Sequence, residues 1–216
     1  CFETPEELSL KRKSQLSSGK PPVYDRSSLK LSLKDIEGFK SQEKKPHYRF
    51  LLKHETVFWN DMVRGDSKYN MRNISDPIIV REDGRFIYTL ASVIDDIDFN
   101  ISHIIRGEDH VTNSAAQIQI FNSIGENVPI MGHLSLMTDI KGEGLSKRTG
   151  GLSIKDLRNE EIESLSLNSY LSLAGTSENI ILRENLKEII SDFEITNFNR
   201  APTKFNFNDL KNLNSK

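Results

Sequence analysis

The pattern of hydrophobic and polar positions is irregular at the start of the chain, where apolar residues are few. Thr4 precedes Pro5, and Glu7 lies one helical turn after Thr4, which is the arrangement of a capping box with proline in the first turn. We therefore expect a helix from Pro5 to about Leu16. Residues 31–42 mix charges with sparse apolar residues, and this pattern fits either a short helix or a loop.

Short β-rich runs follow, at residues 48–52 and 55–59. Further on, the apolar run 77–81 and the run 86–88 flank Glu82-Asp83-Gly84-Arg85. An Asp-Gly pair between two such runs is typical of a tight turn, so this stretch predicts a β-hairpin.

The middle of the chain alternates between strand and helix patterns, and the second of its two helices has an amphipathic pattern that ends at Gly125, a typical cap residue. The alternation predicts a parallel α/β layer. The expected elements are a helix at 89–98, a buried strand at 101–106, a helix at 112–124 and a further strand within 128–137.

The last third of the chain has mainly helical patterns. We expect helices at 153–157, at 164–173 with Gly175 as the stop, and at 186–193. The tail from Thr196 shows little periodicity apart from residues 208–213.

Composition narrows the class of protein. The 216 residues carry a net charge of −2 and are 36% hydrophobic, so a globally basic nucleic-acid coat and wholesale disorder are both excluded. The absence of a long apolar run predicts that no segment spans a membrane. Cys1 is the single cysteine, which excludes an internal disulfide and favours a reducing cytoplasm. Because the chain opens on cysteine, we interpret it as a piece of a longer protein.

The glycine-rich stretch 142–151 carries Ser146, Lys147 and Arg148. Flexible backbone beside two cations suits a polyphosphate, although the spacing of a P-loop is absent. Taken alone, an isolated Ser-Lys-Arg run is more typical of a solvated surface loop. Its place after the last predicted strand favours the phosphate interpretation, because ligands bind at the carboxyl ends of such strands.

Two further blocks precede this loop. Arg106 ends a predicted strand and is followed by Gly107, so its guanidinium could bind a carboxylate at the edge of the sheet. The alternative is an arginine paired with its own neighbours Glu108 and Asp109. The run from Tyr88 to Ser92 presents hydroxyls at a strand-to-helix junction, where packing is the alternative role.

These blocks, in this order, resemble the bacterial glutamyl-tRNA synthetases, a family of class I aminoacyl-tRNA synthetases. The resemblance covers most of residues 2–175. It rests on Tyr88–Asp96, His103–His110, His133–Met137 and Leu145–Arg148, with weaker matches at Thr4–Leu8 and Pro21–Arg26.

The resemblance implies an α/β fold. We expect the second half of a Rossmann-type catalytic domain at residues 87–143, preceded at 1–86 by an α/β insertion that binds the tRNA acceptor stem. A helical stem-contact domain with the signature loop would occupy 144–216.

The resemblance also implies the site residues and ligands. Lys147 would contact the ATP phosphates, with Ser146 and Arg148 shaping the loop, and Mg²⁺ would enter as the ATP complex. The glutamate pocket would contain Tyr88, Ser92 and Arg106, and the adenine site would be bordered by Leu136 and Met137. The partner is the acceptor stem of tRNA(Glu), for which Lys11 to Lys13 are candidate phosphate contacts, and we expect a cytoplasmic monomer.

Departures from the family pattern shape these expectations. Gly144 stands where the family's first signature lysine is expected, and Ser92 where the family often has asparagine. Because the zinc-binding cysteines of some relatives are absent, apart from Cys1, we expect no structural zinc. The His-Ile-Gly-His block is also absent, so the first half of the nucleotide-binding fold would precede Cys1, and the anticodon-binding region would follow Lys216. Two alternatives remain open: a glutamyl-queuosine-tRNA-type paralogue and a non-catalytic tRNA-binding module.

Overall fold

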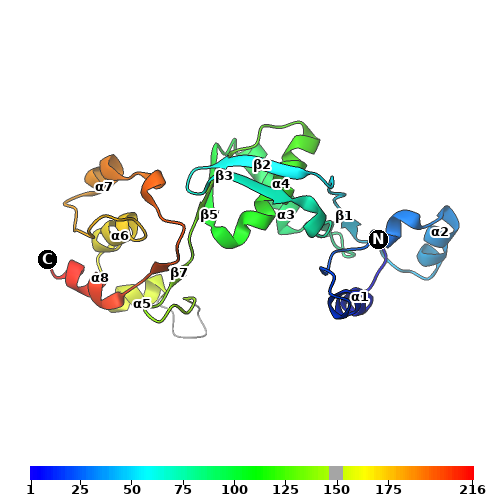
Figure 1. Ribbon diagram of the computed structural model, residues 1–216, viewed down its shortest axis with the longest axis horizontal. Coiled ribbons are helices and arrows are strands. Elements are labelled where there is room, and N and C mark those ends of the chain that lie inside the picture. Colours follow the sequence, from blue (N-terminus) through cyan, green and yellow to red (C-terminus); the bar gives the residue numbers. More distant parts are fainter. Residues whose placement is uncertain (146–152) are drawn as a thin grey trace. The chain divides into compact units, whose positions relative to one another are not determined.

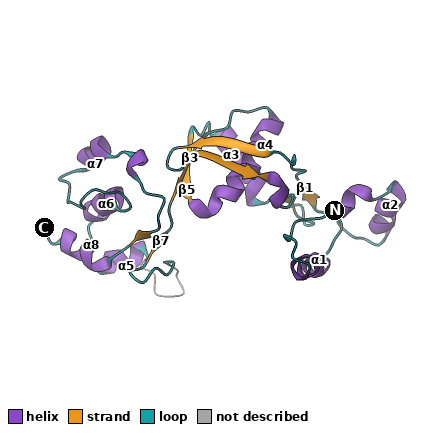
Figure 2. Cartoon of the chain, in the orientation of Figure 1, coloured by secondary structure: helices purple, strands orange, loops and turns teal. Residues whose placement is uncertain are grey.

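The computed structural model of this chain describes residues 1–145 and 153–216 (Figure 1). Helices and strands are mixed along it, with strict alternation of strand and helix confined to its middle part (Figure 2). The α-helices are α1 (Pro5–Ser17), α2 (Leu33–Ser41), α3 (Tyr88–Asp98), α4 (Val111–Ile124), α5 (Ile154–Asn159), α6 (Ser164–Leu173), α7 (Leu186–Asp192) and α8 (Phe207–Asn214). The strands are β1 (Tyr48–Arg49), β2 (Thr56–Asp61), β3 (Gly65–Asn70), β4 (Ile78–Val80), β5 (His103–Gly107), β6 (Ile130–Leu134), β7 (Met137–Thr138) and β8 (Thr203–Lys204).

The chain forms two compact units. The first unit consists of Cys1–Trp59, Asp66–Ile104 and Val111–Ile130, and the second of Asn60–Gly65, Ile105–His110 and Met131–Lys216. The division at residues 86 and 143 that the sequence suggested stays a prediction. Across residues 1–145 and 153–216, no helix combines the length and the apolar character that a bilayer span requires.

The strands form a four-stranded sheet with the order β3-β2-β6-β5 and two small pairs, β1-β4 and β7-β8. β2 and β6 are parallel, with Asp61 opposite Met131, and β7 runs parallel to β8. β1 and β4 are antiparallel. The predicted α/β class is confirmed, whereas β3 and β8 were not predicted, because neither has the apolar run by which strands are recognised.

The first two helices of the first unit begin at capping boxes. The Thr4 hydroxyl accepts a hydrogen bond from the Glu7 amide in α1, as predicted. Ser32 and Asp35 make the same reciprocal pair at α2. The alternatives left open for residues 31–42 are thereby resolved in favour of a helix, because a capping box satisfies amides that otherwise lack partners.

α3 and α4 pack against each other in the first unit, where both carry labels in Figure 1. Val93 from α3 meets Ile120 and Phe121 from α4 in a buried cluster. The expectation of an amphipathic α4 was wrong: its residues from Ser114 to Phe121 are all buried. A helix enclosed on all sides needs no polar face. Gly125 caps α4 with a φ of +90°, as predicted.

The predicted hairpin is borne out around its Asp-Gly turn. Val80 and Phe86 form an antiparallel bridge, and the amides of Arg81 and Ile87 donate to the carbonyls of Arg85 and Ile79 at 2.9 Å each. Two details need correction. Tyr88, expected to end the hairpin, is the first residue of α3. The strand near residues 101–106 exists as β5 but is not buried, since Ile105 is 49% exposed and β5 stands last in the strand order. The strand expected within residues 128–137 is confirmed as β6, and the short strand β7 starts at the last residue of that range.

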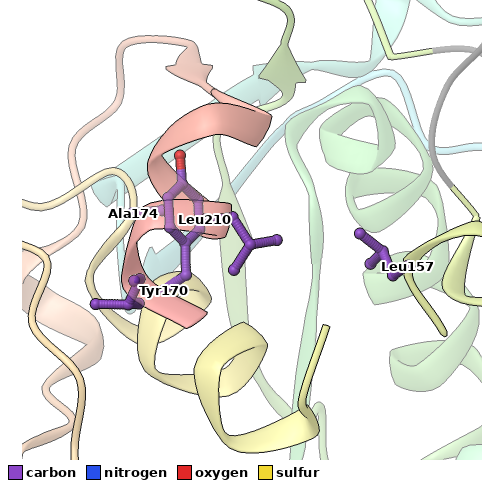
Figure 3. Packing of buried hydrophobic residues seen from close by; sticks show 5 residues of the cluster. Leu157, Tyr170, Ala174 and Leu210 are labelled. Atoms are coloured by element: carbon purple, nitrogen blue, oxygen red, sulfur yellow. The ribbon is translucent and has the colours of Figure 1, made fainter. Parts of the chain in front are cut away.

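The second unit contains the helices predicted after residue 153. Its core includes Leu157, Tyr170, Ala174, Leu210 and Leu213. Figure 3 shows the Tyr170 ring beside Leu210, so α6 and α8 share this core. α5, α6 and α7 confirm the helices predicted at 153–157, 164–173 and 186–193. The weak helical periodicity of residues 208–213 lies within α8.

Candidate active site

Tyr88 and Ser92 both lie in the first turns of α3, in the first unit. The Tyr88 side chain is 49% exposed. The Ser92 hydroxyl donates to the Tyr88 carbonyl at 2.8 Å and accepts from the side-chain amide of Gln117 at 2.6 Å. Two of the predicted glutamate-pocket residues are therefore joined by a hydrogen bond, and a third residue, which the sequence had not singled out, holds them.

Arg106 lies on β5, where the strand approaches its end at Gly107. A side chain on Gly107 would put its Cβ 2.6 Å from the Asp109 carboxylate and 3.2 Å from Leu136, so the backbone here accepts only glycine without rearrangement. Leu136, which we expected at the adenine site, therefore lies beside the end of the arginine strand.

The acidic neighbour of this glycine has a distant partner. Glu108 pairs with Arg64 at 2.9 Å, both in the second unit. The alternative that Arg106 pairs with Glu108 or Asp109 stays open, because Arg64 contacts only one oxygen of the Glu108 carboxylate.

A buried carboxylate–imidazole pair lies in the same unit. The Asp61 carboxylate at the end of β2 is 2.5 Å from the His133 ring on β6, and both side chains have no exposed surface. The other Asp61 oxygen accepts from the amides of Val63, Arg64 and His133. One carboxylate thus fixes the turn after β2 and attaches it to β6. Sequence reasoning missed this pair because its members are 72 positions apart and belong to no short motif.

Leu136 and Met137 lie next to each other before and within β7. The Leu136 carbonyl accepts from the Thr203 amide at 3.1 Å, which ties this segment to β8. Met137 packs against the core of the second unit and also lines a cavity of about 420 Å³ with Leu145, Leu157 and Phe205. The predicted adenine contacts of both residues stay predictions.

The predicted phosphate-binding residues Ser146, Lys147 and Arg148 lie outside the described residues. The segment just before them is ordered by a turn. The Asp139 carboxylate accepts from the amides of Lys141 and Glu143 at 2.8 Å each, and Thr138 forms a bridge with Gly144. The first residues of the glycine-rich stretch, up to Gly144, are therefore held in place by Asp139 and Thr138.

Polar groups near the start of the chain form a second cluster. Within residues 1–145 and 153–216, Cys1, Glu3 and His47 are the one group whose ligand atoms lie close enough together to hold a metal ion. The Glu3 carboxylate, however, accepts from the hydroxyls of Ser27, Ser28 and Tyr24. Burial by itself would raise the pKa of Glu3, but these hydrogen bonds outweigh it and lower the pKa to about 2. The expectation of no structural zinc stays a prediction.

Lys11, one of the candidate phosphate contacts, has acidic partners in this same cluster. Its ammonium lies 3.0 Å from Asp25 and 2.7 Å from the Ser27 hydroxyl. A lysine committed to a carboxylate is a weaker candidate for a tRNA phosphate than the sequence suggested.

The α/β fold of this chain is that of a class I aminoacyl-tRNA synthetase catalytic domain. The family model for tRNA synthetases class I (E and Q), catalytic domain, matches residues 1–214, and the chain belongs to this family. Curated relatives include glutamate–tRNA ligase 2 of Rickettsia canadensis (strain McKiel), 50% identical over the whole chain, and glutamate–tRNA ligase 1 of Rickettsia bellii (strain OSU 85-389), 49% identical. The chain spans about half the length of these relatives, 48% in each case.

Solved structures show the same fold. The glutamate–tRNA synthetase of Elizabethkingia anophelis matches with a TM-score of 0.84 at 24% identity, over 99% of this chain and 48% of that one. A glutamate–tRNA ligase of Elizabethkingia meningosepticum, solved in complex with its amino acid, matches with a TM-score of 0.83 over the same shares. At this level of identity the likeness concerns the fold alone.

Proposed function

We propose that this chain is part of the catalytic core of a glutamate–tRNA ligase. The observation that carries the proposal is the 50% identity to a glutamate–tRNA ligase over the whole chain. The geometry at the end of the Arg106 strand supports it. Gly107 lets the backbone lie close to Leu136 at the edge of the sheet, where a class I synthetase would bind its substrates. The protein would work as a cytoplasmic monomer with the acceptor stem of tRNA(Glu) as its partner.

The reaction would proceed in two steps. The glutamate α-carboxylate attacks the α-phosphate of ATP, pyrophosphate leaves, and the glutamyl group then passes from the adenylate to the 3′ end of the tRNA. No nucleophile from the protein is needed, so the chain contributes positioning and electrostatic stabilisation.

Five of the predicted residues have a direct role in this scheme. Arg106 would pair with a glutamate carboxylate as a bidentate donor, and Tyr88 would hold the same substrate through its hydroxyl. Lys147 would balance the charge that develops on the departing pyrophosphate. Leu136 and Met137 would border the adenine. Mg²⁺ would arrive with ATP and reduce the charge of its phosphates.

The test is amino-acid-dependent exchange of pyrophosphate with ATP, measured on the full-length protein that contains residues 1–216. We expect exchange with glutamate and charging of tRNA(Glu). Exchange with glutamate followed by transfer only to queuosine-bearing tRNA would favour the paralogue, and tRNA binding without exchange would favour the non-catalytic module. Residues 1–216 alone should give no measurable exchange, because the block that holds ATP in this family is not among them.

A further inference from the structure

The contact between α3 and α4 combines an apolar cluster with a polar link between two side chains. Val93, Ile120 and Phe121 fill the apolar part. Near the start of α3, the side-chain amide of Gln117 reaches across from α4 and donates to the Ser92 hydroxyl at 2.6 Å. Gln117 is 2% exposed, so its amide is enclosed and its hydrogen bonds decide its orientation.

The Ser92 hydroxyl is fully engaged as a donor. A serine hydroxyl carries one hydrogen and two lone pairs. Ser92 gives that hydrogen to the Tyr88 carbonyl one turn earlier, at 2.8 Å, and accepts from Gln117. It cannot donate to a substrate carboxylate while this bond is in place. The hydrogen bonds therefore favour a role for Ser92 in holding Tyr88 over a direct contact with glutamate.

The first turn of α3 lacks the usual side-chain cap. Ile87 occupies the N-cap position and makes no side-chain hydrogen bond to the helix amides. Serine, threonine, aspartate or asparagine at that position would fix the turn. The link from Gln117 through Ser92 to the Tyr88 carbonyl supplies a fixed point that the N-cap residue does not.

We propose that Gln117 is a positioning residue of the glutamate pocket. Its buried amide orients the Ser92 hydroxyl, the hydroxyl holds the Tyr88 backbone, and the start of α3 then presents the Tyr88 side chain to the amino acid. The proposal rests on the proposed function, and it adds a residue that touches no substrate but decides how well glutamate is held.

Gln119 is a matched control on the same helix. It is also buried, at 5% exposure, and its side chain makes hydrogen bonds to the amide and carbonyl of Lys53 at 2.8 and 3.0 Å. Replacing either glutamine with methionine keeps the volume and removes a buried amide. The two variants share the structural cost, and only Gln117→Met breaks the link to Ser92 and Tyr88.

The experiment measures KM for glutamate, KM for ATP and kcat by pyrophosphate exchange in the full-length protein, with thermal unfolding alongside. Gln117→Met should raise KM for glutamate by about five- to tenfold, the equivalent of one lost hydrogen bond, and leave KM for ATP unchanged. Both variants should lower the unfolding temperature by a similar amount. Gln119→Met should leave KM for glutamate unchanged. Equal kinetics in the two variants would overturn the proposal.

A second variant keeps the test decisive if Gln117→Met fails to fold. Ser92→Ala removes the middle of the link at a half-exposed position and should raise KM for glutamate to the same extent. In the double variant the two effects should not add, because either change alone breaks the link. Unchanged KM for glutamate in Ser92→Ala would contradict the proposal. A wild-type protein without glutamate-dependent exchange would instead refute the proposed function, so the two failures are distinguishable.

Discussion

The Asp61 carboxylate and the His133 imidazole form a fully buried pair at 2.5 Å. The same carboxylate also accepts three backbone amides, from Val63, Arg64 and His133. If the carboxylate were removed, all of these donors would lose their acceptor at once. The pair therefore holds the turn after β2 against β6.

Asp61→Ala should be among the most damaging substitutions in the second unit. It leaves a buried imidazole and several amides without an acceptor, at an expected cost of about 3–5 kcal/mol in the free energy of unfolding. Urea unfolding of wild type and variant measures this loss. A change of less than about 1 kcal/mol would show that water or another group replaces the carboxylate.

Glu3 should make stability depend on pH in the acid range. Its pKa falls from the usual 4.5 to about 2 in the folded protein. A carboxylate with a lowered folded-state pKa adds stability that is complete above the unfolded pKa and is lost as the pH falls through the folded pKa. The difference in unfolding free energy between wild type and Glu3→Gln should therefore be constant above about pH 5.5 and shrink between pH 5 and pH 2. A difference that stays constant across that window would contradict the assigned hydrogen bonds.

Gly175 should tolerate a methyl group less well than Gly125. Both glycines follow helices with positive φ, +94° and +90°, so alanine is strained at both. Only at Gly175 would the new Cβ also meet a neighbour, the Thr203 hydroxyl at 2.5 Å, whereas nothing lies within 4 Å at Gly125. We expect Gly175→Ala to lose at least about 1 kcal/mol more than Gly125→Ala in chemical unfolding. Equal losses would mean that β8 shifts freely away from α6.

Local signals predicted the helices well. Thr4 with Glu7, Gly125 after α4 and Gly175 after α6 are short-range features, and each ends or begins a helix where expected. The capping box at Ser32 and Asp35 is equally local and could have resolved the open alternatives for α2 from the sequence alone.

Features set by distant contacts were not predictable in the same way. The burial of α4 on all sides depends on the segments that surround it, and the hydrophobic periodicity of its own sequence does not reveal it. β8 is a strand because it pairs with β7, since its own residues carry no strand pattern. The Asp61–His133 and Gln117–Ser92 contacts join residues 72 and 25 positions apart, and no spacing rule covers them.

For the candidate site, the sequence predicted which residues take part, and the structure shows the contacts of some of them. Tyr88 and Ser92 meet on α3, and Leu136 lies beside Gly107 at the end of the Arg106 strand. That these groups converge with Lys147 on one glutamate and one ATP remains the prediction on which the proposed mechanism depends.

Lys147→Ala in the full-length protein tests that prediction most directly. The matched control is Lys155→Ala, which removes an exposed lysine on α5 outside the glycine-rich stretch. We predict that Lys147→Ala lowers kcat for glutamate-dependent pyrophosphate exchange by at least about 100-fold, because a charge that stabilises the transition state is lost. Lys155→Ala should keep wild-type exchange. Full exchange in Lys147→Ala would contradict the account.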